Sequence, residues 1–324
     1  MQYIPHEYQK YATEKIIELP ACALFMEMGL GKTVSTLTAI NELIYDRFEV
    51  QKVLVIAPYR VADDTWTTEA DKWDHLKHLR VSKVLGTSGE RIAALEADAD
   101  IYVINRENVT WLVNLMGKEW PFEMIVVDEL SSFKSNSAKR FKSLRIVRPL
   151  ARRFVGLTGT PAPNGLLDLW PQVYLIDRGE RLGKTYTGYK DRYFLPDRRN
   201  GFVVYSWTPK EGAKEAIEQK LSDICISMKA DDYLNLPAQI VNDVYVSMDR
   251  HEMRKYRELE KEKLLELDGK EITALSAAAV WGKLLQLANG AAYDGEGNVI
   301  PLHDRKLDAL AEILEASGGH PVLV

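Results

Sequence analysis

Short apolar runs alternate with helix-patterned segments along the first half of the chain. The runs predicted as strands lie at 21–25, 52–58, 81–85, 101–104, 124–128 and 153–157. The segments predicted as helices lie at 3–17, 34–45, 61–76, 89–97, 108–115 and 137–147. Apolar strands separated by helices predict an α/β fold with a parallel sheet covered on both faces. Ligands of such sheets bind beyond the carboxyl ends of the strands.

The pattern changes after residue 164. Residues 165–235 mix aromatic and charged residues with glycine and proline breaks and show no clear strand order. The later predicted helices lie at 166–177, 210–222, 249–266, 272–287 and 306–316. A turn at 294–298 predicts a small hairpin, and the apolar run 321–324 reads as a buried strand. A last strand with no partner after it suggests that a second sheet is cut off.

The apolar run at 21–25 leads into a glycine-rich turn that ends in Lys-Thr. Gly29 and Gly31 allow backbone N–H groups to turn inward around an oxyanion. The following helix directs the positive end of its dipole to the same place. Lys32 can reach nucleotide phosphates, and the Thr33 hydroxyl can hold Mg²⁺. The usual spacing asks for glycine where this chain has Met26, so a chance Gly-Lys-Thr at an ordinary helix start is the alternative.

Polar residues also follow two later strands. Asp128 ends the run at 124–128 and Glu129 follows it. The first acid can bind Mg²⁺, and the second can orient or deprotonate an attacking water. Thr158, Gly159 and Thr160 end the run at 153–157, and their hydroxyls can hydrogen-bond the acids or a γ-phosphate. The alternative for the second group is a plain glycine turn with a threonine cap.

Composition excludes several classes of protein. The 324 residues, 46% hydrophobic and 27% charged, suggest about two globular domains. No apolar run approaches the length of a membrane span, and the amino terminus lacks signal-peptide features. Cys22 and Cys225 lie in apolar surroundings and indicate core residues rather than a disulfide framework. Trp66 and Trp73, seven residues apart, are expected on one helix face in the core.

Net charge is −5, but one segment is strongly basic. Between residues 130 and 153 there is no acidic residue, and the basic ones are Lys134, Lys139, Arg140, Lys142, Arg145, Arg148, Arg152 and Arg153. Such a segment can neutralise a phosphate backbone. A solvated helix face explains it equally well.

These motifs together resemble the Swi/Snf-like branch of superfamily 2 helicases and translocases. Residues 26–33 match its motif I, which reads Asp-Glu-Met-Gly-Leu-Gly-Lys-Thr, except at Met26. Residues 128–131 stand where the family has Asp-Glu-[Ala/Gly]-His, with Ser131 replacing the histidine. Residues 157–164 resemble motif III. Two further matches are 57–60 with Trp66, which resemble the DNA-contacting motif Ia, and 5–9, which resemble the adenine-recognition segment.

The resemblance implies a RecA-like lobe that binds ATP with Mg²⁺ and couples hydrolysis to movement along DNA. It assigns adenine to Gln9, phosphates to Lys32, Mg²⁺ to Thr33 and Asp128, and the attacking water to Glu129. The rest of the nucleotide loop would be Met28, Gly29, Leu30 and Gly31. Coupling residues would be Ser131, Thr158, Gly159 and Thr160. DNA, duplex and without sequence preference, would meet Pro58, Arg60, Asn105 and Arg106.

The same resemblance implies a domain order. Residues 1–164 would form the first RecA-like lobe, 165–290 a mainly helical protrusion, and 291–324 the start of a second RecA-like lobe. The arginine finger of that lobe would be missing, so we expect ATP binding with poor turnover. Compact proteins of this kind are familiar from phages and prophages, which suggests a cytoplasmic monomer in a bacterial or phage-infected cell and no membrane partner.

Two other functions remain open from the sequence. One is a nucleotide-regulated DNA-binding module without turnover, because Met26 and Ser131 depart from the family pattern. The other is an unrelated P-loop kinase or small-molecule ATPase. A kinase should be indifferent to DNA, whereas a binding module should bind DNA without stimulated hydrolysis.

Overall fold

The chain forms two compact units, Met1–Leu236 and Pro237–Val324, which are described separately. The computed structural model describes residues 1–200, 203–233, 240–262, 264–267, 270–273 and 277–324. The boundaries expected at 164 and 290 concern functional regions and stay predictions. Within the described part, no helix is both long and apolar enough to cross a bilayer.

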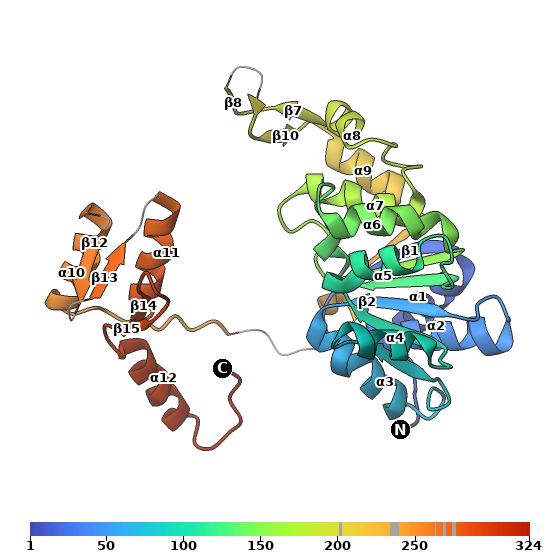
Figure 1. The fold of residues 1–324 in the computed structure, drawn as a ribbon, viewed down its shortest axis with the longest axis horizontal. Helices are drawn as coiled ribbons and strands as arrows, with labels where there is room; N and C mark the ends of the chain where they lie inside the picture. Colours follow the sequence, from blue (N-terminus) through green and yellow to red (C-terminus); the bar gives the residue numbers. More distant parts are fainter. Residues whose placement is uncertain (201–202, 234–239, 263, 268–269, 274–276) are drawn as a thin grey trace. The chain divides into compact units, whose positions relative to one another are not determined.

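The first unit is built on a seven-stranded parallel sheet with strand order β11-β1-β6-β5-β2-β4-β3 (Figure 1). The strands are β1 (Ala21–Met26), β2 (Val53–Ala57), β3 (Val81–Val84), β4 (Ile101–Asn105), β5 (Met124–Asp128), β6 (Arg153–Thr158) and β11 (Cys225–Met228). Six of the seven are the strands predicted from the apolar runs, so the predicted α/β class with a parallel sheet is confirmed.

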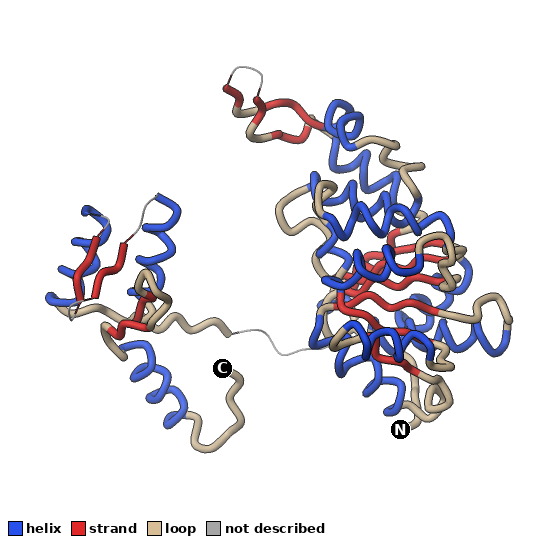
Figure 2. The backbone as a smooth tube through the Cα atoms, viewed as in Figure 1, coloured by secondary structure: helices blue, strands red, loops and turns tan. Residues whose placement is uncertain are grey.

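Helices cover both faces of this sheet (Figure 2). One face packs against α1 (Glu7–Glu18), α2 (Lys32–Asn41) and α3 (Trp66–Lys72). The other packs against α4 (Ser88–Glu96), α5 (Val109–Met116), α6 (Lys139–Val147), α7 (Leu169–Asp177) and α9 (Ala213–Leu221). Successive residues of β1 alternate between the two cores, with Cys22 and Leu24 in one and Ala23 in the other. This two-sided burial explains why the inner strands read as continuous apolar runs, whereas the edge strand β3 contains Ser82 and Lys83.

The helix predicted at 61–76 is interrupted. Val61–Thr65 forms a π-helical turn, α3 follows, and Trp73 already has extended backbone. Trp66 is fully buried as expected, but Trp73 lies beyond the helix and packs edge-on against Tyr3. The two tryptophans therefore do not share one helix face, because the helix ends at Lys72 and Trp73 instead donates to the Glu69 carboxylate, Nε1 to Oε2, at 2.8 Å.

Strand β11 and several small elements were not predicted. β11 is a short edge strand in which only Met228 is buried, so it carries no apolar run. Its pairing with β1 is a tertiary contact over about 200 residues that local pattern does not reveal. The other unpredicted helices and strands of the first unit are α8 (Tyr186–Tyr193), the pair β7 (Phe194–Pro196) with β10 (Trp207–Pro209), and the pair β8 (Arg199–Asn200) with β9 (Val203–Val204).

The second unit contains α10 (Arg250–Glu262), β12 (Leu264–Leu267), β13 (Lys270–Thr273), α11 (Ala277–Ala288), β14 (Ala291–Tyr293), β15 (Val299–Pro301) and α12 (Arg305–Ala316). A small core joins α10, α11, β14 and β15 through Leu259, Val280, Leu284, Leu287, Ala292 and Ile300. The predicted hairpin turn at 294–298 is confirmed by the β14–β15 pair.

Three predictions for this unit are wrong: two helices have shifted ends, and one strand is absent from the described residues. The helix predicted to 266 ends at Glu262, and 264–266 belong to β12. The helix predicted from Ile272 begins at Ala277, since Ile272 lies in β13, and residues 274–276 fall outside the described part. The apolar end at 321–324 has no regular structure, and Leu323 is fully exposed, because a strand forms only where a neighbouring strand satisfies its backbone groups.

Candidate functional site

The glycine-rich turn lies between β1 and α2, at the carboxyl edge of the sheet. Gly29 and Gly31 have φ values of 84° and 76°, in the left-handed region that glycine adopts without strain. Gly31 is the residue that precedes the first turn of α2. A Cβ atom at Gly31 would also lie 2.3 Å from Gln9 Nε2. Both positions therefore require glycine, and the turn leaves the amino end of α2 open to an anion.

Lys32 lies across the turn. Its Nζ donates hydrogen bonds to the carbonyl oxygens of Met26 at 2.7 Å and Glu27 at 3.1 Å. Burial lowers the pKa of Lys32, and the negative charges of Asp128, Glu129 and Glu27 oppose that shift. The ammonium group thus stands close to three carboxylates and is free to exchange carbonyl partners for a stronger anion.

Asp128 ends β5 with its carboxylate largely removed from solvent. Burial raises the pKa of Asp128, while the hydrogen bond from Trp66 and the charge of Lys32 lower it. The Trp66 Nε1–H donates to Asp128 Oδ2 at 3.1 Å, and Trp66 itself is completely buried. The carboxylate is therefore oriented by a rigid indole on α3.

Glu129 has left-handed backbone, with φ 58° and ψ 60°, which is uncommon for a residue with a side chain. Its Oε1 accepts hydrogen bonds from the hydroxyls of Ser131 and Thr158, the latter at 3.0 Å. The predicted contact between the hydroxyl residues and the acidic pair is present. The backbone turn directs Glu129 toward β6 rather than along the continuation of β5.

The turn after β6 lies against the glycine-rich turn. Thr158 is buried, and the Thr160 N–H donates to Thr158 Oγ1 at 3.2 Å. A Cβ atom at Gly159 would lie 3.4 Å from the Met26 carbonyl oxygen, which is van der Waals distance. The segments at 26–33, 128–131 and 158–160, far apart in sequence, are therefore neighbours.

Gln9 is buried where α1 meets the glycine-rich turn. Its Oε1 accepts from the His6 N–H at 3.0 Å, and its Nε2 is 3.4 Å from the Leu30 carbonyl oxygen. A cavity of about 510 Å³ opens beside it. Its lining includes Tyr3, Ile4, His6, Gln9, Met28, Gly29, Gly31, Lys32, Thr33, Val34 and Trp73. The Leu30 side chain is in the core, so only its backbone faces this site.

The four predicted DNA contacts lie at the carboxyl ends of β2 and β4: Pro58 and Arg60 follow β2, Asn105 is the last residue of β4, and Arg106 follows it. Arg60 is exposed, and its side chain has no hydrogen-bond or ion-pair partner among the described residues. Asn105 is buried and donates to Glu107 Oε2 at 3.0 Å, and Arg106 pairs with Glu107 Oε1 at 2.9 Å. In this conformation Arg60 presents a free cation, whereas Glu107 engages the other two side chains.

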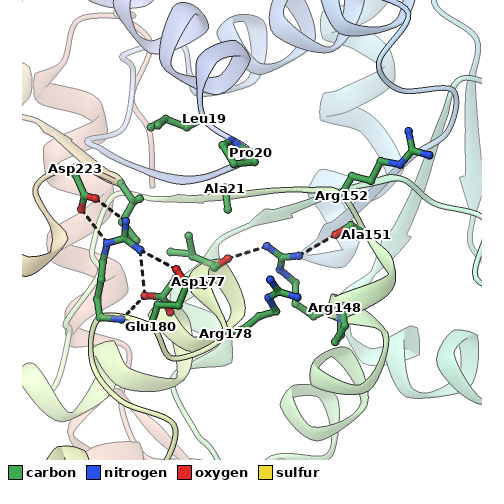
Figure 3. A pocket seen from close by; sticks show the side chains of 14 residues that line it. Leu19, Pro20, Ala21, Arg148, Ala151, Arg152, Asp177, Arg178, Glu180 and Asp223 are labelled. Carbon is green, nitrogen blue, oxygen red and sulfur yellow. Dashed lines mark hydrogen bonds and ion pairs between the residues drawn. The ribbon is translucent and has the colours of Figure 1, made fainter.

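Two cations of the basic segment are structural. The Arg148 guanidinium donates to the carbonyls of Leu175, Ile176 and Ala151 at 2.6 to 3.0 Å and so caps the carboxyl end of α7. Figure 3 shows its contact with Ala151. The Arg153 guanidinium donates to the Ile16 carbonyl at 2.9 Å and caps α1 in the same way. Both are buried and unavailable to a phosphate backbone, which corrects the expectation that all eight basic residues form one surface.

The cavity beside Arg148, about 480 Å³, lies where β1 and β6 begin. It is therefore at the opposite edge of the sheet from the glycine-rich turn. Arg181, which lines this cavity, pairs with Asp177 and Asp223. Figure 3 shows Arg152 extending away from Arg148. The nucleotide-type site is the one at the carboxyl edge.

Sequence reasoning assigned no role to Glu27 and placed Trp66 only in the core and in a DNA-contact motif. Trp66 sits 62 residues before the acid it bonds, and Glu27 binds the Ala230 backbone 203 residues later. Neither spacing carries a local signal. Both contacts exist only because the parallel sheet brings the strand ends together.

Comparison with known proteins agrees with this geometry. A family model for the SNF2-related domain matches residues 8–290. The chain belongs to the SNF2-related domain family. This confirms the predicted resemblance to Swi/Snf-like superfamily 2 ATPases.

Three individual relatives also match the chain in sequence. The chain is 39% identical to Putative protein p41 of Acyrthosiphon pisum secondary endosymbiont phage 1, over 99% of this chain and 72% of that protein. It is 28% identical to the Bos taurus DNA annealing helicase and endonuclease ZRANB3, over 68% of this chain and 20% of that protein. It is 30% identical to the mouse DNA excision repair protein ERCC-6-like, over 52% of this chain and 14% of that protein.

A solved structure shares the fold. The Sulfolobus solfataricus SWI2/SNF2 ATPase core in complex with dsDNA superposes with a TM-score of 0.59 at 20% identity, covering 97% of this chain and 64% of that one. The parallel sheet with helices on both faces is thus a RecA-like lobe. The chain spans a fifth or less of the two animal proteins, so it corresponds to one part of them.

Proposed function

We propose that this chain is the ATP-binding part of a DNA-dependent translocase motor. One observation carries the proposal: Lys32, on a glycine-rich turn before a helix, lies within electrostatic reach of the Asp128–Glu129 pair, which follows β5 two strands away in the sheet. A kinase or another P-loop ATPase would share the turn. The family membership and the hydroxyl contacts to Glu129 favour the translocase.

The donor set fits ATP with Mg²⁺. The two positive-φ glycines and the amino end of α2 suit a polyphosphate, and Lys32 can leave its carbonyl partners to bind the β- and γ-phosphates. Thr33 and Asp128 supply the hydroxyl and carboxylate oxygens that Mg²⁺ prefers. The ion, when bound, neutralises phosphate charge. Glu129 would accept a proton from the attacking water, and Gln9 would read the adenine edge.

The contacts to Glu129 support a coupling role for Ser131, Thr158, Gly159 and Thr160. Ser131 and Thr158 occupy one carboxylate oxygen of Glu129, and Gly159 lies against the phosphate turn. A shift of either turn therefore changes how Glu129 is held. Ser131 would take the place of the family histidine in this linkage.

DNA binding is proposed at Pro58, Arg60, Asn105 and Arg106. Phosphate contacts of this kind carry no sequence information, so binding should be nearly sequence-blind and should weaken steeply with salt. The favoured DNA is duplex. We also propose that the protein acts as a monomer in the cytoplasm of a bacterial or phage-infected cell, without a membrane partner.

Turnover by this chain should be slow. Among the described residues that line the nucleotide cavity there is no arginine. An arginine that stabilises the transition-state charge contributes about 10³-fold or more in phosphoryl transfer. Binding is therefore expected without brisk hydrolysis.

The test is an ATP-binding titration beside hydrolysis assays with and without duplex DNA. We expect binding with little turnover, loss of binding in Lys32→Ala, and binding without residual turnover in Glu129→Gln. Wild-type turnover in the glutamine variant would rule out the role of Glu129. Binding of DNA with no hydrolysis at all would favour the nucleotide-regulated binding module, and indifference to DNA would favour a kinase or small-molecule ATPase.

A further inference from the structure

The chain that follows β11 is fastened to the phosphate turn by Glu27. β11 pairs in parallel with β1 as far as Met26 and Met228. Beyond that pair, the Glu27 N–H donates to the Met228 carbonyl oxygen at 3.1 Å. The Glu27 side chain continues the contact, since its Oε2 accepts from the Ala230 N–H at 2.7 Å. One residue of the phosphate turn therefore holds the later segment on both sides of Lys229.

Glu27 is also a partner of Lys32. The Lys32 Nζ donates to the Glu27 carbonyl oxygen at 3.1 Å and to the neighbouring Met26 carbonyl at 2.7 Å. The peptide groups of Glu27 thus lie directly between the phosphate-binding lysine and the segment at 228–230. When Lys32 exchanges its hydrogen-bond partners, the Glu27 carbonyl directly loses a donor.

A second contact ties the same segment to α1. The rings of Tyr8 and Tyr233 have centroids 4.9 Å apart, and Tyr8 is the neighbour of Gln9. Tyr233 is the last described residue before the boundary between the two units at Leu236 and Pro237. The segment that leads into the second unit therefore contacts the phosphate turn through Glu27 and contacts α1, beside Gln9, through Tyr8.

We propose that Glu27 is a positioning residue that links occupancy of the phosphate site to the hold on residues 228–233. The inference rests on the proposed ATP site. When Lys32 turns to phosphate, the Met26 and Glu27 carbonyls lose its hydrogen bonds. The arriving phosphates also repel the Glu27 carboxylate. Both effects weaken the bond to Ala230, so nucleotide binding loosens the segment that leads into the second unit.

Thermodynamic linkage gives the reciprocal effect. If nucleotide favours the loosened state, then breaking the Glu27 contact must favour nucleotide binding by the same factor. Glu27→Ala removes both the charge and the acceptor. Glu27→Gln removes the charge but keeps a carbonyl oxygen that can accept from the Ala230 N–H. Comparing the two variants therefore separates the effect of charge repulsion from the effect of losing the hydrogen bond.

The experiment measures hydrogen–deuterium exchange of the peptide spanning 226–233 in the full chain, with and without a non-hydrolysed ATP analogue and Mg²⁺. In the wild type, nucleotide should speed exchange at least about threefold. In Glu27→Ala, exchange should already be about tenfold faster without nucleotide, should not respond to it, and should accompany several-fold tighter nucleotide binding. Glu27→Gln should keep most of the protection.

A matched control is Glu18→Gln, because Glu18 is an exposed acid on the same unit whose single ion pair among the described residues is with Lys15, at 2.7 Å. It should behave as wild type. Wild-type protein that binds the analogue without a change at 226–233 would overturn the linkage while leaving the proposed function intact. Unchanged protection in Glu27→Ala would do the same. Failure of the wild type to bind nucleotide in a parallel titration would overturn both.

Discussion

At the scale of single residues, the acids of the site are held by neighbours that leave them few orientations. Asp128 is set by the Trp66 indole and Glu129 by two hydroxyls and by its own left-handed backbone. Backbone strain of this kind persists only where the surroundings impose it. The pattern is that of a site organised before its ligand arrives.

The Trp66 contact can be tested directly. Trp66→Phe keeps most of the ring but removes the hydrogen bond to Asp128, an interaction with a charged group worth about 1.5 kcal/mol, or about tenfold. We expect the Mg²⁺ concentration needed for half-maximal nucleotide binding to rise about tenfold in a fluorescence titration. Trp120→Phe is the control, because the buried Trp120 indole N–H has no hydrogen-bond partner in the described structure. An equal shift in both variants would contradict the role of Trp66.

A second residue-scale prediction concerns acid stability. Burial raises the pKa of Asp100, but hydrogen bonds from the Arg80 side chain and backbone and from the Tyr45 hydroxyl outweigh it and hold the pKa below its ordinary value. A depressed carboxyl pKa stabilises the fold above the unfolded pKa, about 4, and this stability is lost as pH falls through the folded pKa. Asp100→Asn should lower the free energy of unfolding by about 2 kcal/mol at pH 7.

Urea unfolding at several pH values checks this, and the difference from wild type should shrink below about pH 4. Asp98→Asn serves as the control, since Asp98 also contacts Arg80 but is exposed. It should leave stability nearly unchanged. A difference between wild type and Asp100→Asn that does not vary with pH would argue against the ionic origin.

At the scale of elements, two helix ends depend on distant arginines. α7 and α1 end without a side-chain cap of their own, and Arg148 and Arg153 supply the missing donors for their last carbonyls. Burial lowers the pKa of Arg148 to about 10, a shift to which nearby Arg178 adds and which Asp177 opposes. A guanidinium buried this deeply contributes to the fold through its hydrogen bonds.

The Arg148 cap predicts a clear difference between neighbouring arginines. Arg148→Met leaves three buried carbonyls without their donor and should lower the free energy of unfolding by about 3 kcal/mol. Arg152→Met changes an exposed cation whose nearest acid, Glu123, is 3.8 Å away, and should have almost no effect. Thermal and urea unfolding of the two variants measure this. Similar losses in both would mean that charge, rather than the cap, matters.

Element prediction succeeded for six strands of the sheet, including the edge strand β3, and failed for β11 at the opposite edge. Five of the six could be read locally because they are mostly apolar and buried. β3 fits the alternation of strands and helices, although Ser82 and Lys83 interrupt its apolar residues. β11 could not be read locally, since it gains its place from β1 and from Glu27 rather than from its own pattern. The helix predicted at 249–266 runs too far, because the tertiary pairing of β12 with β13, rather than the local pattern, sets where α10 ends.

At the scale of the whole molecule, each unit has its own core. The two cores of the sheet draw all their buried residues from within the first unit, and the small core of the second unit draws its own from 259–300. The nucleotide cavity is lined entirely by residues of the first unit. Folding and nucleotide binding should therefore be properties of that unit.

A chain of residues 1–236 is expected to fold cooperatively and to bind ATP within about threefold of the full chain's affinity. The physical reason is that no described side chain of the nucleotide site lies outside it. Thermal unfolding by circular dichroism and a binding titration check the two parts. A molten or aggregated product, or affinity reduced by more than tenfold, would show that the second unit completes the site.

The sequence by itself determined the parallel α/β class, the glycine turn, the acidic pair and the threonine turn, because buried strands and strand-end residues are local features. Tertiary structure alone decided which residues meet: Trp66 with Asp128, Thr158 with Glu129, and Ala230 with Glu27. It also decided that Arg148 and Arg153 cap helices rather than face a ligand. Such pairings depend on strand order and register, and the spacing of residues along the chain determines neither of them.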